Sequence, residues 1–272
     1  MQVEVYGGNH SPWVQAVLLA LHDKGIEHNL RQVPPLETLQ KWGVLMPAIS
    51  VNNGPWQIES SKILVELGYK QISDVDLQAV KGAWQGVLHR IDSPWQFFAA
   101  FARAGDSSPS AFKRTRRNFL RSFISMYMFT LINFAKLKMK PKDPKNFGDQ
   151  YLSWERAVAS GDPFLDGEAP GARDLLLFGV VQCHSSIPVP PLISLANDQR
   201  LSGLRDWVGR MHEWFRDYPH LYSGEYFEPR LPQPVAQTSL QQGIFYIGLM
   251  TLLAAMPVTL TLIFVLIRRV PR

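Results

Sequence analysis

Residues 243–267 constrain the fold most, because this long stretch, GIFYIGLMTLLAAMPVTLTLIFVLI, contains no charged side chain. As one helix it would be about 37 Å long, against a bilayer hydrocarbon core of about 30 Å. Pro257 is tolerable as a kink within such a span. A buried core helix is the alternative, but such helices rarely run this far without a polar face. We expect one C-terminal transmembrane helix over 243–267, followed by a basic tail over 268–272.

Composition restricts the remaining possibilities. The net charge of +5 and the pI of about 9.3 suit an anionic lipid surface but are too weak to indicate nucleic acid as a partner. The chain has one cysteine, Cys183, so an intramolecular disulfide and a cysteine-rich zinc site are both excluded. The segment MQVEVYGGNH has neither a basic region nor an apolar run, so we expect no signal peptide.

The segment 1–70 alternates between strand and helix signals. Ser11 is a typical N-cap and Pro12 a favoured first helical residue, and Gly25 ends the apolar helical pattern. The sequence NNG over 52–54 predicts a hairpin turn. We expect strands over 2–7, 27–33, 47–51 and 55–59, helices over 12–24 and 60–69, and a loop with a turn of helix over 34–42. The order is β-α-β-α-β-β-α.

From residue 76 onward the strand pattern disappears and long helical patterns take its place. We therefore divide the chain into an α/β domain over 1–70 and an all-α domain over 76–222. A Pro- and Gln-rich linker over 223–242 leads to the apolar segment.

A small β-α-β-α-β-β-α unit followed by helices resembles the soluble glutathione transferase superfamily over residues 2–222. The segment SPWVQAVLLALHDKGI is similar to that family's first helix, MPAI to its cis-proline strand, and ESSKIL to its acid-Ser pair. The resemblance implies a thioredoxin-like domain that binds glutathione, followed by a helical domain of the glutathione transferase C-terminal type. It also implies a cis bond between Met46 and Pro47.

The later segment DPFLDGEAPGARDLLLFGVV resembles the motif that precedes the family's buried helix. The N-cap position falls on Gly171, which has no side-chain oxygen, while Asp174 can still accept bonds from helix N-terminal amides. Arg173 departs from the motif. The part from 162 onward is also similar to the type 2 membrane-associated prostaglandin E synthases, but this chain lacks their C-x-x-C motif.

The resemblance assigns roles to a few positions. Ser11 would be the catalytic residue that activates the glutathione thiol, and the backbone of Met46 beside Pro47 would pair with the peptide. Glu59 and Ser60 would bind the γ-glutamyl end. Each position also has a purely structural interpretation: Ser11 as a helix cap, and Glu59 with Ser60 as the start of a helix.

Other residues give weaker signals. Tyr6 and Trp13 are candidates for a pocket wall, although a tyrosine in a strand more often packs and an indole can fill a site rather than line it. Gln40 and Lys41 match the glycine-carboxylate position only loosely. We predict an inert buried thiol at Cys183 and no metal site, since the histidines show no tight pairing.

Three functions remain open at this point. The first is a membrane-anchored glutathione transferase that conjugates the glutathione thiolate to an apolar electrophile. The second is a non-catalytic scaffold on the same fold, at a membrane complex or organelle surface. The third is a glutathione-dependent isomerase or reductase, and the serine-type site disfavours the reductase.

The expected partners and location follow from these assignments. Glutathione would be the co-substrate, and the lipid bilayer, the electrophile and, because relatives are often dimers, a second copy would be the other partners. We expect a single-pass anchor with the remaining domains in the cytoplasm, where glutathione is abundant. The arginines beyond the span oppose this topology by the positive-inside tendency, although the tail over 268–272 is short enough to cross.

Overall fold

The computed structural model describes residues 2–85, 94–95, 98–99, 102, 110–140, 144–159, 161–186, 189–223, 226–228 and 237–269. The chain forms two compact units. Unit 1 comprises Met1–Val87 with Pro144–Leu231, and unit 2 comprises Leu88–Asp143 with Pro232–Arg272. The units therefore group the first domain and most of the predicted helical domain together, and they separate residues 88–143 from that helical domain. Much of the expected linker over 223–242 lies outside the described residues.

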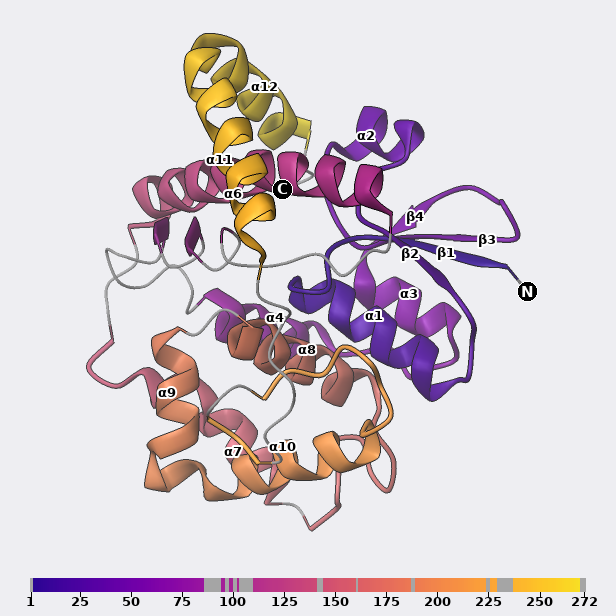
Figure 1. Ribbon diagram of the computed structural model, residues 1–272. Coiled ribbons are helices and arrows are strands. Elements are labelled where there is room, and N and C mark those ends of the chain that lie inside the picture. Colours follow the sequence, from indigo (N-terminus) through magenta and orange to yellow (C-terminus); the bar gives the residue numbers. More distant parts are fainter. Residues whose placement is uncertain are drawn as a thin grey trace. The chain divides into compact units, whose positions relative to one another are not determined.

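Unit 1 begins with a four-stranded mixed sheet in the order β2-β1-β3-β4 (Figure 1). Strand β1 pairs parallel to β2 and antiparallel to β3, which pairs antiparallel to β4. The elements in chain order are β1 (Val3–Tyr6), α1 (Pro12–Asp23), β2 (Asn29–Arg31), α2 (Leu36–Trp42), β3 (Ala48–Val51), β4 (Gln57–Ile58) and α3 (Ser60–Glu66). This order confirms the predicted β-α-β-α-β-β-α unit and its thioredoxin-like arrangement.

The hairpin between β3 and β4 follows directly from the sequence. Asn52 and Asn53 both have positive φ, at 51° and 57°, and the Gly54 amide donates to the Val51 carbonyl at 2.9 Å. Two consecutive left-handed residues define the turn that matches the twist of antiparallel strands. Asparagine tolerates this conformation better than most residues do.

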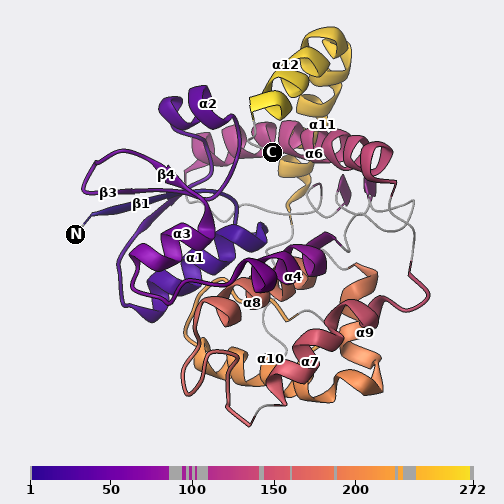
Figure 2. The same ribbon diagram turned by 180° about the vertical axis from the view of Figure 1, so that it is seen from behind.

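The rest of unit 1 is helical, as the sequence predicts. Its elements are α4 (Asp74–Gln85), η2 (Phe147–Tyr151), α7 (Leu152–Val158), α8 (Ala172–Ser186), α9 (Pro190–Asn197), η3 (Gln199–Leu201) and α10 (Ser202–Trp214). Helix α8 is the central one, because nearly all of its side chains are buried. Helices α1, α3 and α4 all lie beside it (Figure 2).

The Asp174 side chain fixes the start of α8. It is fully buried and accepts bonds from the amides of Leu165 at 2.8 Å and Gly171 at 3.0 Å, and from the Trp207 indole at 2.8 Å. This confirms the expected role of Asp174 as an acceptor for amides around the helix start. The unusual Arg173 pairs with Asp166, which precedes α8, at 2.6 Å, so the residue that departs from the motif has a partner in the segment before the helix.

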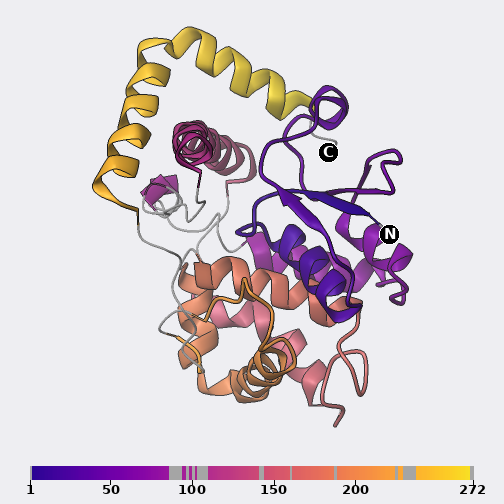
Figure 3. The ribbon, with the colours of Figure 1, turned by 45° about the vertical axis from the view of Figure 1, so that its right-hand side comes forward.

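Unit 2 contains α6 (Ala111–Met139), α11 (Ser239–Ala254) and α12 (Met256–Arg269). Here the structure differs from the single helix expected over 243–267: α11 and α12 meet at an angle of 94°, seen as a corner in Figure 3. The break has a local cause. Pro257 lacks a backbone N–H and occupies the second position of α12, where a helix start tolerates it.

Within the described residues, no single helix combines the length and apolarity that a membrane crossing requires. Two pairs of helices joined by a sharp bend have the length and composition of a membrane span when each pair is taken together, namely α8 with α9 and α11 with α12. Helix α8 is buried inside unit 1, so its apolar character is explained by the core. Attachment of the C-terminal segment to a membrane stays a prediction.

Gly179 in α8 allows α8 to approach the first turn of α1. A Cβ atom at this position would overlap the Pro12 carbonyl oxygen and would lie 3.3 Å from the Ala16 amide nitrogen. These contacts are with backbone, which cannot rotate away as a side chain can. Gly209 in α10 offers a matched comparison, because nothing lies within 4 Å of the corresponding Cβ position.

We predict that Gly179→Ala and Gly209→Ala have opposite effects on stability. The first substitution should lower the free energy of unfolding by about 1–3 kcal/mol, because it overpacks a backbone contact. The second should raise it by about 0.5–1 kcal/mol, because alanine is the better helix former. Urea unfolding of the two variants tests this. Equal effects of the two substitutions would show that α8 and α1 are not in backbone contact.

Candidate functional site

The strand register brings three loops to one end of the sheet. Tyr6 in β1 pairs with Ala48 in β3, and Ala48 pairs with Ile58 in β4. The residues beyond these pairs therefore lie together: the loop after Tyr6, the Met46–Pro47 bond before β3, and Glu59 with Ser60 after β4. The Gly8 amide donates to the Met46 sulfur at 3.4 Å, which joins two of the three loops directly.

Two backbone predictions at this end of the sheet are confirmed. The Met46–Pro47 bond is cis. Ser11 occupies the N-cap position of α1, with Pro12 as the first helical residue. The Ser11 side chain accepts no capping bond from the first turn, and the residue is only half-buried. Ser11 is therefore the N-cap residue, as predicted, but it caps the helix through its backbone and not through its hydroxyl.

Glu59 has the most unusual backbone near the site. Its φ of 78° and ψ of 99° lie outside the regions that a residue with a Cβ atom prefers, and its side chain is exposed. Such conformations cost on the order of 1–3 kcal/mol and gather at functional sites. The next residue, Ser60, is buried with 7% of its surface exposed. The first intrahelical bond at the Glu59 carbonyl comes from the Lys62 amide at 3.0 Å.

The two aromatic candidates pack against neighbouring residues. Tyr6 is 1% exposed, and its hydroxyl donates to the Val44 carbonyl at 3.4 Å. Trp13 is half-buried, with its ring 6.4 Å from that of Trp84 on α4. Both observations agree with the packing interpretation. A role for either residue as a pocket wall stays a prediction.

The structure also describes the surroundings of Gln40, Lys41 and Cys183, whose sequence signals were weaker. The Lys41 ammonium lies 2.7 Å from Glu37 on the same helix, and Gln40 is exposed. Cys183 is 2% exposed, and burial raises the pKa of its thiol to about 12, which keeps it protonated. Among the described residues no group of three His, Cys, Asp or Glu side chains is placed to hold a metal ion.

A buried polar network, which the sequence did not predict, lies behind the Ser11 turn. Gln15 is fully buried, and its amide donates to the Asn9 carbonyl at 2.7 Å. The Tyr218 hydroxyl donates to the Gln15 side-chain oxygen at 3.1 Å, and the Asn9 amide donates to the Tyr222 hydroxyl at 2.8 Å. The segment around 218–222 therefore holds the loop that leads into α1. The sequence does contain one signal for this network, because Gln15 is a polar residue within an otherwise apolar run.

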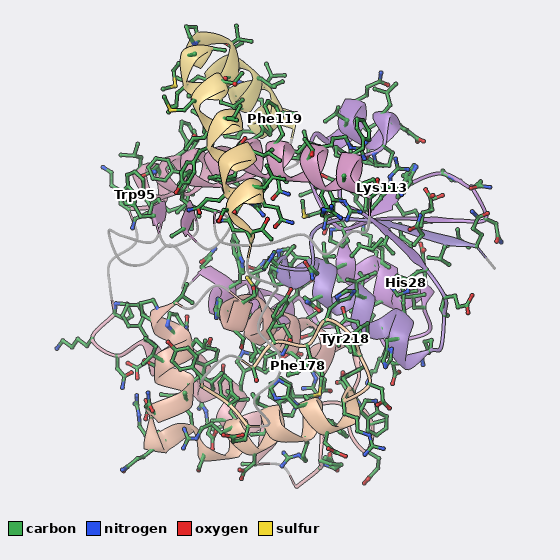
Figure 4. All side chains as sticks on the ribbon, viewed as in Figure 1. His28, Trp95, Lys113, Phe119, Phe178 and Tyr218 are labelled. Carbon is green, nitrogen blue, oxygen red and sulfur yellow. The ribbon has the colours of Figure 1, made fainter. Side chains whose placement is uncertain are left out.

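The network continues to α8 and α10; Figure 4 labels Phe178 on α8 and Tyr218 in the segment after α10. The Tyr222 amide donates to Gln182 Oε1 at 2.6 Å, and Gln182 Nε2 donates to the Tyr222 carbonyl at 2.9 Å. His212 Nε2 lies 3.3 Å from Gln182 Nε2, and the His212 ring packs on Phe178 at 5.2 Å. Burial lowers the pKa of His212 to about 4, so this ring is neutral at pH 7.

Comparison with known proteins gives distant structural likenesses. No protein-family model matches the chain, and no curated protein matches it. A glutathione S-transferase from Pseudomonas fluorescens Pf-5 has 16% identity, a TM-score of 0.43, and coverage of 81% of this chain and 98% of its own. A theta class enzyme from Xanthomonas axonopodis pv. citri, solved with glutathione bound, has 14% identity, a TM-score of 0.43, and coverage of 79% and 95%.

A third solved structure, glutathione S-transferase isozyme E7 from Drosophila melanogaster, has 15% identity, a TM-score of 0.42, and coverage of 79% and 89%. All three are glutathione transferases, the family that the motifs resemble. With TM-scores below 0.5, these likenesses carry no argument about the activity of this chain. The similarity to prostaglandin E synthases stays a prediction.

We predict that stability falls as the pH drops from 7 to 5, and that His212 carries part of the fall. The unfolded histidine takes up a proton near pH 6.5 and the folded one near pH 4, so acid favours the unfolded state. The share of His212 is about 2 kcal/mol over this interval. Urea unfolding of His212→Gln at both pH values should show a smaller loss than the wild type. An identical loss would mean that His212 has the same pKa in the folded and the unfolded protein.

Proposed function

We propose that unit 1 binds glutathione where the three loops meet, and that the chain is a transferase-like protein for apolar electrophiles. The observation that carries the proposal is the strained, exposed Glu59 beside buried Ser60. A carboxylate held there can pair with the γ-glutamyl ammonium group, and this pairing gives the unfavourable backbone conformation a reason. The Ser60 hydroxyl can bond to the neighbouring carboxylate of the ligand.

The proposed chemistry needs only a positioned thiol. The Ser11 hydroxyl, which the helix does not use as a cap, donates to the glutathione sulfur. The N-terminus of helix α1 favours the thiolate over the thiol, whose unperturbed pKa is about 8.5. The thiol proton goes to solvent, the sulfur lone pair forms the new bond to an electrophilic carbon, and the leaving group departs from that carbon with the electron pair of the broken bond. The backbone of Met46, just before β3, pairs with the peptide of the ligand.

A second candidate is a non-catalytic scaffold. It is favoured by the contacts of the loop before Ser11, because Asn9 bonds to Tyr222 and the His10 ring stacks on the Tyr222 ring at 5.8 Å. A loop engaged in this way can serve binding and structure without turnover. Retention on glutathione resin without conjugation of a chromogenic electrophile would assign the chain to this second function.

Location is part of the proposal. We propose that the C-terminal segment attaches the chain to a membrane and that unit 1 faces the cytoplasm; to act as a single-pass anchor, the segment would have to straighten at the bend between α11 and α12. Attachment would bring the thiolate close to electrophiles that partition into lipid. The support is the charge-free sequence over 243–267, ended by Arg268 and Arg269. A homodimer, common among the proteins that the motifs resemble, completes the proposed set of partners.

We predict that Glu59→Gln weakens glutathione binding at least tenfold, because the counter-charge for the ligand ammonium is lost. Glu66→Gln is the matched control, since it removes an exposed acid at the other end of α3. Isothermal titration with glutathione measures both variants. If Glu59→Gln and the control bind equally well, glutathione does not occupy the proposed position.

We also predict that Glu59→Gly separates stability from binding. Glycine adopts a positive φ without strain, so this variant should unfold with a free energy about 1 kcal/mol higher than the wild type. The same variant should lose glutathione affinity. A variant that is less stable than the wild type would show that Glu59 makes contacts that hold the fold.

Ser11→Ala tests catalysis separately from binding. We predict that it lowers the rate of conjugation at least tenfold while glutathione affinity changes little, because the hydroxyl acts on the sulfur. The pH dependence of the rate should move toward the pKa of a free thiol, about 8.5. A rate and a pH profile equal to those of the wild type would remove Ser11 from the mechanism.

A further inference from the structure

The modest net charge of the chain conceals a strong separation between the two units. Residues 88–143 and 232–272 hold 14 Lys or Arg and 3 Asp or Glu, a net charge of +11. Unit 1 holds 14 basic and 20 acidic residues, a net charge of −6. The three acidic residues of unit 2, Asp92, Asp106 and Asp143, lie outside the described residues. Every charged side chain described in unit 2 is basic.

Helix α11 has two different faces. Its inner face packs on α6: Phe245 is fully buried, and a Cβ atom on Gly248 would lie 2.5 Å from the Ser122 hydroxyl. On the other face large apolar side chains are open to the surroundings, with Ile247 65% and Met250 64% exposed. Exposed apolar surface of this extent marks a site of interaction.

Helix α12 extends this apolar surface past the bend. Its buried positions are Thr259, Ile263 and Leu266, which form one narrow stripe. Most of the remaining circumference is apolar and exposed, including Val258 at 70% and Phe264 at 46%. By length, α11 and α12 reach about 24 Å and about 21 Å, so each is shorter than a hydrocarbon core of about 30 Å.

The two ends of α6 combine basic and apolar side chains. At its start Lys113 and Arg116 are exposed next to Phe112, which is 76% exposed, and Figure 4 labels Lys113 and Phe119 on this helix. At its end Lys138 is exposed next to Leu137, which is 74% exposed. This mixture is typical of helices at a membrane interface, where cations meet headgroups and apolar groups enter the acyl boundary.

We propose that unit 2 is a docking module for a bilayer that contains anionic phospholipid. The exposed apolar faces of α11 and α12 enter the membrane boundary, and the basic ends of α6 lie on the headgroups. Nucleic acid fits less well, because it offers nothing to the apolar side chains between the basic ones. With the bend between α11 and α12 retained, this docking takes the place of a spanning anchor and adds a requirement for anionic lipid; it does not depend on the glutathione site in unit 1.

The experiment measures partition of the full chain, without glutathione, into vesicles of phosphatidylcholine alone and of phosphatidylcholine mixed two to one with phosphatidylglycerol. We expect at least tenfold tighter partition into the anionic vesicles, decreasing as salt is raised. The variant K113Q/R116Q/K138Q should lose roughly a hundredfold on anionic vesicles, because each basic side chain near such a surface changes affinity by about fivefold.

The control K62Q/K70Q/K145Q removes the same charge from exposed lysines of unit 1 and should change partition less than threefold. The variant I247Q/M250Q/F264Q should partition less into both kinds of vesicle. Circular dichroism confirms that each variant is folded. Equal partition of the wild type into both kinds of vesicle would overturn the proposal. An equal loss of partition in K113Q/R116Q/K138Q and in the control K62Q/K70Q/K145Q would also overturn it. Displacement from vesicles by duplex DNA would also overturn it, by assigning the basic residues to nucleic acid.

Discussion

The contact between Gly179 and the Pro12 carbonyl is the constraint on which unit 1 depends. It lets a fully buried helix, α8, lie against the first turn of α1, where Ser11 begins the helix. A larger residue would push the two backbones apart, because interiors are too closely packed to absorb a methyl group. The position of the candidate site is therefore set by a helix from a distant part of the chain, and Asp174 fixes the start of that helix.

The elements that the sequence predicts correctly are those that local rules determine. Ser11 and Pro12 start α1, Asn52 and Asn53 make the hairpin turn, and the alternation around Val5 places β1 in the sheet. The expectation for Asp174 was also correct, because an acid at a helix start has few other partners. In each case the residues that specify the structure lie within a few positions of one another, so a single sequence contains the whole signal.

The features that the sequence did not predict depend on contacts between distant residues. Gln15 bonds to Tyr218, which comes from the far part of the chain, and no local pattern indicates that pair. The bend near Pro257 was missed for a different reason: the composition of 243–267 is compatible with one helix, and a proline is tolerated both within such a span and at a helix start, so the sequence did not decide between the two. The separation of charge between the units became visible only when the compact units were known.

This separation also affects how the candidate site can work. Glutathione is an anion at neutral pH, and unit 1 carries a net charge of −6, so its long-range field does not attract the ligand. At the proposed site, affinity would then have to come from short-range contacts, such as those proposed for Glu59 and Ser60. The same field opposes contact between unit 1 and anionic headgroups, whereas unit 2 is attracted to them. With this distribution of charge, an anionic surface attracts unit 2 and repels unit 1.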